Sequence, residues 1–189
     1  MNDTKGSIST NDNSNLSKEA ESNFENRNQL EVNNDLENII IDSISFNLEN
    51  LIRANQKVAQ YCPQDLFFLS FIPKISLNEY IRNLVKQTNM EISTLILAVI
   101  YIDRFCYKNN YIITKTNIIR ILLTSCLLSL KFNQDSLITN ETYSKIVSLS
   151  MEDLQNLEIH MYFKLKYSLM VQDSLYKKYY NYFKSRSQD

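Results

Sequence analysis

Two apolar stretches decide the fold of this chain: residues 95–105 read LILAVIYIDRF, and residues 118–132 read IIRILLTSCLLSLKF. Both are apolar on nearly every side of a helix, and a helix of that kind is buried inside a protein. The longer stretch contains Arg120 and Lys131 and is too short to cross a bilayer. We therefore expect two buried helices at the centre of the fold.

Helices that are apolar on one side flank the two buried ones. The first begins at Ser76, which stands three residues before Glu79 in the pattern of a capping box. A short helix is expected over residues 141–147, and a longer one starts after Ser150 and runs to about residue 166. Because the one-sided helices must cover the apolar ones, the sequence predicts an all-α fold with five core helices.

Composition divides the chain into four segments. Residues 1–33 are rich in Asn, Ser, Asp and Glu with few large apolar side chains, so we expect a disordered polar tail. Residues 34–70 hold an amphipathic helix, with apolar residues three and four positions apart, and an apolar linker. The five-helix core is assigned to residues 71–170, and an aromatic helix with a short tail to residues 171–189.

Glycine occurs once, at Gly6, and this scarcity excludes several kinds of site. Phosphate loops and dinucleotide-binding turns need glycine where the backbone approaches the ligand. The single histidine, His160, and three cysteines without a CxxC pair offer neither a clustered metal site nor a nucleophile system. We therefore expect no catalytic activity, no small-molecule substrate, no metal and no cofactor.

Charge and cysteine usage indicate where the protein works. The net charge is −1, from 20 basic and 21 acidic side chains, which gives no broad field to attract nucleic acid or an anionic membrane. The N-terminus is polar and shows no secretory signal. An odd number of cysteines, two of them inside apolar stretches, fits reduced thiols. We expect a protein of the cytoplasm or nucleus that binds neither nucleic acid nor membrane.

The order of the helices and five local sequences resemble the cyclin box. The similarity covers about residues 71–167, and the last two pieces resemble the P/U-type branch, the phosphate-signalling cyclins of fungi and plants with a single box. The pieces are YIR at 80–82, AVIYIDRF at 98–105, LLTS at 122–125 with LKF at 130–132, NETYSK at 140–145, and LS at 149–150 with LQNLE at 154–158.

The chain departs from the P/U-type pattern at two places. That pattern usually has a glycine pair before the fifth core helix, where this chain has Val147 and Ser148. An acidic pair commonly follows the lysine-aromatic motif, where this chain has Asn133 and Gln134. These departures bear on the subfamily more than on the fold.

The resemblance implies a regulatory subunit that forms a heterodimer with a cyclin-dependent protein kinase and activates it without chemistry of its own. Lys131 and Glu158 would face the kinase and hydrogen-bond to its backbone near its regulatory helix αC. Leu128, Phe132, Tyr162 and Tyr167 would share that face. From the pattern alone, Lys131 and Glu158 are better explained as solvated surface charges, and it is the resemblance that favours a binding role for them. Leu128 is equally well explained as a core residue.

The resemblance also implies a buried ion pair inside the chain, between Arg82 on the first core helix and Asp103 on the second. A buried carboxylate needs a partner, since loss of one partner of such a pair costs about 3–5 kcal/mol. We therefore expect loss of Arg82 to lower the stability of the fold.

Two other functions fit an all-α chain of this size. A cyclin-fold adaptor, for example in a transcription assembly, would bind a protein other than a kinase. A helical-bundle enzyme would need carboxylates and histidines that face its interior, and the single His160 argues against it. A choice between a cell-cycle and a nutrient-signalling role stays open.

Overall fold

The computed structural model describes residues 12–58, 65–134 and 138–185 of the chain. These described residues form α-helices and contain no strand, which confirms the predicted all-α class. The chain divides into two compact units, residues 1–38 and residues 39–189. The helices are α1 (Asp12–Ala54), α2 (Leu77–Thr88), α3 (Ile92–Asn109), α4 (Ile118–Asn133), α5 (Asn140–Val147), α6 (Met151–Lys164) and α7 (Asp173–Ser185).

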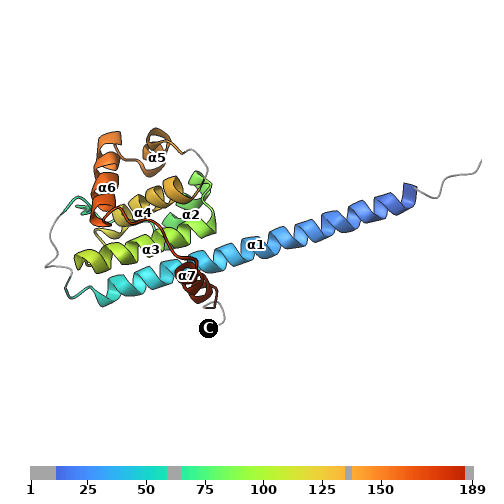
Figure 1. The fold of residues 1–189 in the computed structure, drawn as a ribbon, viewed down its shortest axis with the longest axis horizontal. Helices are drawn as coiled ribbons and strands as arrows, with labels where there is room; N and C mark the ends of the chain where they lie inside the picture. Colours follow the sequence, from blue (N-terminus) through green and yellow to red (C-terminus); the bar gives the residue numbers. More distant parts are fainter. Residues whose placement is uncertain (1–11, 59–64, 135–137, 186–189) are drawn as a thin grey trace, which may run out of the picture. The chain divides into compact units, whose positions relative to one another are not determined.

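Helices α3 and α4 pack against each other at the centre of the second unit (Figure 1). Every residue of α4 from Ile121 to Leu130 is buried, as the all-round apolar pattern predicts. The hydroxyl of Ser125 inside this run donates a hydrogen bond to the carbonyl of Ile121 at 2.6 Å, so its burial leaves no unpaired donor. Helices α6 and α7 pack on α3, and α6 also packs on α4.

Helices α2 and α6 begin at the capping residues that the sequence predicts. The Ser76 hydroxyl accepts a hydrogen bond from the backbone N–H of Glu79 at 3.2 Å, and the Ser150 hydroxyl accepts one from Asp153 at 3.0 Å. Helix α5 ends at Ser148, which takes the left-handed conformation with φ of 54°. The P/U-type pattern usually has a glycine pair at Val147 and Ser148. Ser148 nevertheless adopts a left-handed backbone conformation, which glycine takes without strain.

Helix α1 differs from the disordered tail expected for residues 1–33, because it begins at Asp12. Residues 1–11 lie outside the described residues. No glycine or proline occurs between Gly6 and Pro63, so no helix-breaking residue interrupts the backbone over that length. In the second unit, the predicted apolar stripe is buried at Ile40, Ile44, Leu48 and Ile52, whereas Leu51 and Val58, which the same spacing includes, are exposed. The proposed segment boundaries after residues 33, 70 and 170 stay predictions.

The apolar linker before the core packs partly against it, as its composition indicates. Phe67 is fully buried, and its ring meets the ring of Phe105 edge to face at 5.3 Å. Arg120 on α4 donates a hydrogen bond to the carbonyl of Leu66 at 2.8 Å, which holds the linker in place. Phe71 and Ile72 remain exposed.

The aromatic helix expected near the C-terminus is α7. Its Phe183 is buried, and the Tyr182 hydroxyl donates a hydrogen bond to the side-chain oxygen of Asn47 on α1 at 2.7 Å. Tyr182 and Phe183 therefore help to hold α7 in the second unit.

Candidate protein-binding groove

A groove of about 350 Å³ runs between α4 and α6 and is lined by five of the six residues predicted to bind a partner. The sixth, Tyr167, adjoins it because its ring meets the ring of Tyr162 edge to face at 5.0 Å. The structure therefore gathers all six at one place, although their role in binding stays a prediction. The lining residues are Leu128, Lys131, Phe132, Glu158, Ile159, Tyr162 and Leu169.

Lys131 and Glu158 form an ion pair across this groove. The Lys131 amine lies 2.6 Å from one Glu158 carboxylate oxygen, and the side chains are 36% and 17% exposed. Lys131 stands in the last turn of α4, where the helix dipole favours a cation. The other Glu158 oxygen accepts a hydrogen bond from the Asn140 amide at 2.9 Å. Lys131 at the end of α4 and Asn140 at the start of α5 thus fix the position of the half-buried Glu158 carboxylate.

The ion pair retains hydrogen-bonding capacity. A lysine amine has three donors and a carboxylate has about four acceptor positions, so each side chain can bond to a partner without leaving the other. Hydrogen bonds to charged groups are stronger than neutral ones and contribute about 1.5–3 kcal/mol each. Lys131 and Glu158 can therefore satisfy both exposed carbonyl groups and exposed N–H groups of a partner's backbone.

Exposed apolar side chains surround the pair. Phe132 is 53% exposed and Ile159 is 67% exposed, whereas Leu128 is buried and forms the floor of the groove. Phe163, in the last turn of α6, and Tyr167, just after this helix, are also exposed. Large exposed apolar areas are typical of the interaction sites of proteins.

Tyr167 is held in an unfavourable backbone conformation. Its φ is 57°, in the left-handed region, directly after Lys166 at 55°. A bulky aromatic residue rarely adopts this conformation, and such strain persists where the surrounding structure imposes it, often at functional sites. The Tyr167 N–H donates a hydrogen bond to the carbonyl of Tyr162 at 3.1 Å. This turn at the end of α6 places the Tyr167 ring beside that of Tyr162.

Sequence comparison decides the family. A family model described as "Cyclin" matches residues 1–169. The chain belongs to the cyclin family. This match confirms the resemblance that the five local sequences carry.

Similar proteins come from plants. From Arabidopsis thaliana, Cyclin-U2-1 is 27% identical over 146 residues, which are 75% of this chain and 66% of that protein. Cyclin-U4-3 from the same plant is 30% identical over 141 residues, 74% of this chain and 64% of that protein. Cyclin-P3-1 from Oryza sativa subsp. japonica is 27% identical over 99 residues, 52% of this chain and 42% of that protein. The aligned parts span less than two thirds of each relative, and the U and P types confirm the P/U-type assignment.

The predicted ion pair between Arg82 and Asp103 is wrong for this cyclin. The Arg82 guanidinium instead pairs with Asp42 on α1 at 2.5 Å, and its Nε donates to the Asn78 side chain at 2.8 Å. Asp103 accepts a hydrogen bond from the Tyr179 hydroxyl at 2.6 Å. The physical reason is that the flanking helices α1 and α7 supply partners to both side chains, and neither pairing is visible from the core sequence.

Sequence reasoning missed two residues that line the groove of this cyclin, Ile159 and Leu169, and it missed Asn140, which holds Glu158. Ile159 lies three positions before Tyr162 on the same helix, a spacing that places both on one side and was available as a signal. Asn140 was read as part of a family motif, and its bond to Glu158 depends on how α5 packs on α6. Leu169 follows the end of α6, where no periodic pattern applies.

We also searched the described residues for metal sites, membrane-spanning helices and reactive cysteines. Within them, no group of three or more His, Cys, Asp or Glu side chains is placed to hold a metal ion. No helix among the described residues has both the length and the apolar character needed to cross a membrane. Burial raises the pKa of the Cys106 thiol to about 12, so this cysteine of the cyclin is not a reactive thiolate.

Proposed function

We propose that this cyclin is the regulatory subunit of a cyclin-dependent protein kinase, which it activates by binding the kinase's helix αC. The observation that carries the proposal is the groove between α4 and α6, where an ion pair stands among exposed aromatic side chains. In this proposal the cyclin supplies binding energy and takes no part in the chemistry. It acts in the cytoplasm or the nucleus, in cell-cycle control or phosphate signalling.

The mechanism follows from how protein kinases are switched. In an inactive kinase the glutamate of helix αC is turned away from the lysine of strand β3, and their ion pair is needed to position ATP. A rigid surface that fits only the inward position of αC selects that state. A shift from mostly inactive to mostly active needs about 5.5 kcal/mol of differential affinity. A standard interface of about 1,600 Å² is large enough to supply it.

The groove has the two kinds of residue that such an interface needs. Phe132, Tyr162 and Tyr167 would be the apolar anchors, because aromatic residues in a desolvated centre dominate binding energies. Lys131 and Glu158 would fix the register of αC by bonding to its terminal backbone groups. Their mutual ion pair holds both side chains in place beforehand, which lowers the entropy lost on binding.

The test uses the ion pair itself. The tagged cyclin is recovered from cells that express it, and kinase activity in the recovered fraction is measured with a generic protein substrate. Lys131→Glu and Glu158→Lys each break the pair, whereas the double exchange restores it with reversed polarity. We expect all three variants to lose the kinase. A partner that hydrogen-bonds to a cation at position 131 and to an anion at position 158 cannot bind the exchanged pair in the same way.

The controls separate binding from folding. Each variant is checked by thermal melting and assayed well below its melting temperature. The double exchange is expected to melt above both single variants but below the wild type, because a lysine at position 158 cannot accept the Asn140 amide. If the double exchange recovers as much kinase as the wild type, the pair only stabilises the cyclin and the site assignment fails. If the wild type recovers a stable partner protein but no kinase, the protein is a cyclin-fold adaptor instead.

A further inference from the structure

One wall of the groove between α4 and α6 belongs to a turn rather than to a helix. Residues 165–172 connect α6 to α7, and within them Tyr167 adjoins the groove and Leu169 lines it. Lys166 and Tyr167 both take the left-handed conformation, with φ of 55° and 57°. A residue with a side chain disfavours this conformation, so two in succession persist only where surrounding contacts impose them.

Backbone hydrogen bonds hold only the first half of this turn. The N–H of Tyr167 donates to the carbonyl of Tyr162 at 3.1 Å, and the N–H of Ser168 donates to the carbonyl of Leu165 at 3.3 Å. Among the described residues, the N–H groups of residues 169–172 donate to no backbone carbonyl. The second half of the turn, which begins at Leu169, therefore depends on side-chain contacts for its position.

Arg104 on α3 supplies such a contact. Its Nη1 donates hydrogen bonds to the carbonyl of Met170 at 2.9 Å and to the carbonyl of Ser168 at 3.3 Å. This nitrogen carries two hydrogens, one for each carbonyl, and its positive charge strengthens both bonds. A single side chain thus holds the backbone on either side of Leu169.

Two neighbours of Arg104 extend this contact to the end of α6. The Lys108 amine donates to the carbonyl of Leu165 at 2.8 Å, and the Asn109 amide donates to the carbonyl of Lys164 at 3.4 Å. Residues four positions apart lie on one side of a helix, so Arg104 and Lys108 face the turn together. Arg104 is the member of this row that reaches the half beyond α6.

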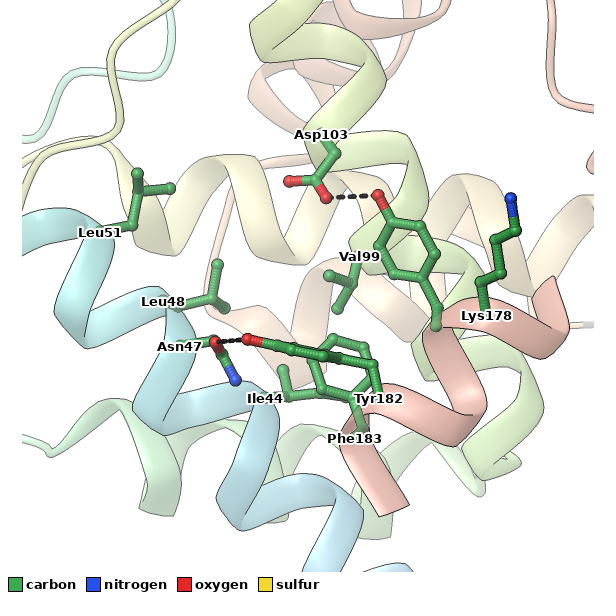
Figure 2. A pocket seen from close by; sticks show the side chains of 10 residues that line it. Ile44, Asn47, Leu48, Leu51, Val99, Asp103, Lys178, Tyr182 and Phe183 are labelled. Atoms are coloured by element: carbon green, nitrogen blue, oxygen red, sulfur yellow. Dashed lines mark hydrogen bonds between the residues drawn. The ribbon is translucent and has the colours of Figure 1, made fainter. Parts of the chain in front are cut away.

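Helix α7 fixes the far end of the turn. The Tyr179 hydroxyl donates a hydrogen bond at 2.6 Å to Asp103, the neighbour of Arg104, and the Tyr182 hydroxyl donates one to Asn47 (Figure 2). These side chains border a hollow of about 500 Å³ beside Asp103, between α1, α3 and α7. Helix α7 therefore sets where the turn ends, and the path of the turn is left to Arg104.

We propose that Arg104 is a positioning residue for the groove. By holding the second half of the turn, it keeps Leu169 in the groove wall and Tyr167 beside the other aromatic side chains. Arg104 does not line the groove, so its effect on a partner passes through the turn. The inference rests on the proposed function, in which Tyr167 is an apolar anchor of the interface.

The first experiment uses NMR on the free, full-length chain. In the wild type, the rings of Tyr162 and Tyr167, whose centroids lie 5.0 Å apart, should give NOE cross-peaks. Arg104→Met keeps a long side chain and removes the donors. In this variant the cross-peaks should disappear, and the Tyr167 amide should exchange at least about tenfold faster, as expected for loss of a charged hydrogen bond.

A matched arginine variant serves as the control. Arg53 on α1 pairs with Glu49 at the surface and does not line the groove, so Arg53→Met should leave the cross-peaks and the Tyr167 exchange rate as in the wild type. Unchanged cross-peaks and exchange in Arg104→Met would overturn the inference. Unfolding of the whole chain by Arg104→Met would overturn it too, because Arg104 would then hold the fold and not the turn.

The second experiment measures affinity for the proposed kinase partner in a double-mutant cycle. Arg104→Met alone should weaken binding by about threefold to tenfold. With Tyr167→Gly already in place, the same change should weaken binding by less than about twofold, because the ring that Arg104 positions is absent.

The cycle separates positioning from other roles of Arg104. A direct contact with the kinase, or a general loss of stability, would give the same factor in both backgrounds, and that result would overturn the inference. A wild type that binds no kinase refutes the proposed function alone, because the cross-peaks and exchange of the free chain still decide whether Arg104 positions the groove wall.

Discussion

The amine of Lys131 lies 2.6 Å from a carboxylate oxygen of Glu158, although the two residues stand 27 positions apart in the sequence. This ion pair joins the end of α4 to the middle of α6, and exposed aromatic side chains line the same groove. The pair is therefore both a link between two helices and the polar centre of the proposed interface.

The two members of this pair should differ in their effect on stability. Lys131→Ala should lower the free energy of unfolding by less than about 1 kcal/mol, because exposed ion pairs contribute little. Glu158→Ala should cost about 1–2 kcal/mol more, since it also leaves the half-buried Asn140 amide without its acceptor. Urea denaturation of the isolated cyclin measures both values. Equal losses for the two variants would show that the Asn140 bond adds nothing.

Tyr167 should show a trade between stability and binding. Tyr167→Gly relieves a left-handed backbone that costs a non-glycine residue about 1–2 kcal/mol, so its melting temperature should be equal to or above that of the wild type. Its affinity for the proposed kinase partner should fall at least about tenfold, because an exposed aromatic anchor is lost. Tyr167→Phe, which keeps the ring, is the control and should bind normally. Retained kinase binding by the glycine variant would remove Tyr167 from the site.

Ser148 should be a site where glycine stabilises the fold. Ser148→Gly should raise the free energy of unfolding by about 0.5–1 kcal/mol, because glycine takes the left-handed conformation without strain and part of that gain is offset by a more flexible unfolded chain. Ser148→Ala is the control and should bring no gain. A glycine variant that melts below the wild type would contradict the assigned conformation at this helix end.

A double-mutant cycle should separate the two candidate partners of Arg82. Arg82 and Asp42 should show a coupling of about 0.5–1 kcal/mol, as exposed ion pairs do, while Arg82 and Asp103 should show none. The measurement is the free energy of unfolding of the single and double alanine variants. Coupling to Asp103 in place of Asp42 would restore the pairing that the family resemblance implies.

His160 should make stability depend on pH. Burial lowers the pKa of His160, and the nearby charge of Lys164 lowers it further, against the opposing effect of Asp65. The unfolded chain therefore binds more protons between the lowered pKa and the ordinary value of about 6.5, so this contribution to stability is complete above that value and is lost as pH falls below it.

The corresponding measurement compares His160→Gln with the wild type at about pH 7.5 and about pH 5.5. The wild type should lose more unfolding free energy on acidification than the variant does. A larger loss in the variant would mean that the folded state stabilises the charged histidine, opposite to the direction expected from its burial beside Phe67.

The sequence allowed the helices to be predicted because their causes are local. The all-round apolar run in α4 and the serine caps at Ser76 and Ser150 act within a few residues, and the structure confirms each. The clustering of Lys131 with Glu158 was expected from family resemblance, since spacing within one helix says nothing about a residue on another.

The remaining features depend on packing between distant segments. Asp42 reaches Arg82 across 40 positions, and Tyr179 reaches Asp103 across 76 positions, so neither partner is marked by any local pattern. The same reason hides Leu169, which meets the groove only because the chain turns back after α6. The hollow beside Asp103 likewise exists only when α7 lies against α1 and α3.

Hydrogen-deuterium exchange of the cyclin, alone and with the proposed kinase partner, tests the central claim most directly. The account predicts that bound kinase slows exchange at the end of α4, around Lys131, and along α6 to Tyr167, while the exchange of α7 stays as in the free protein. Protection confined to α1, α3 and α7, with α4 and α6 unchanged, would contradict it.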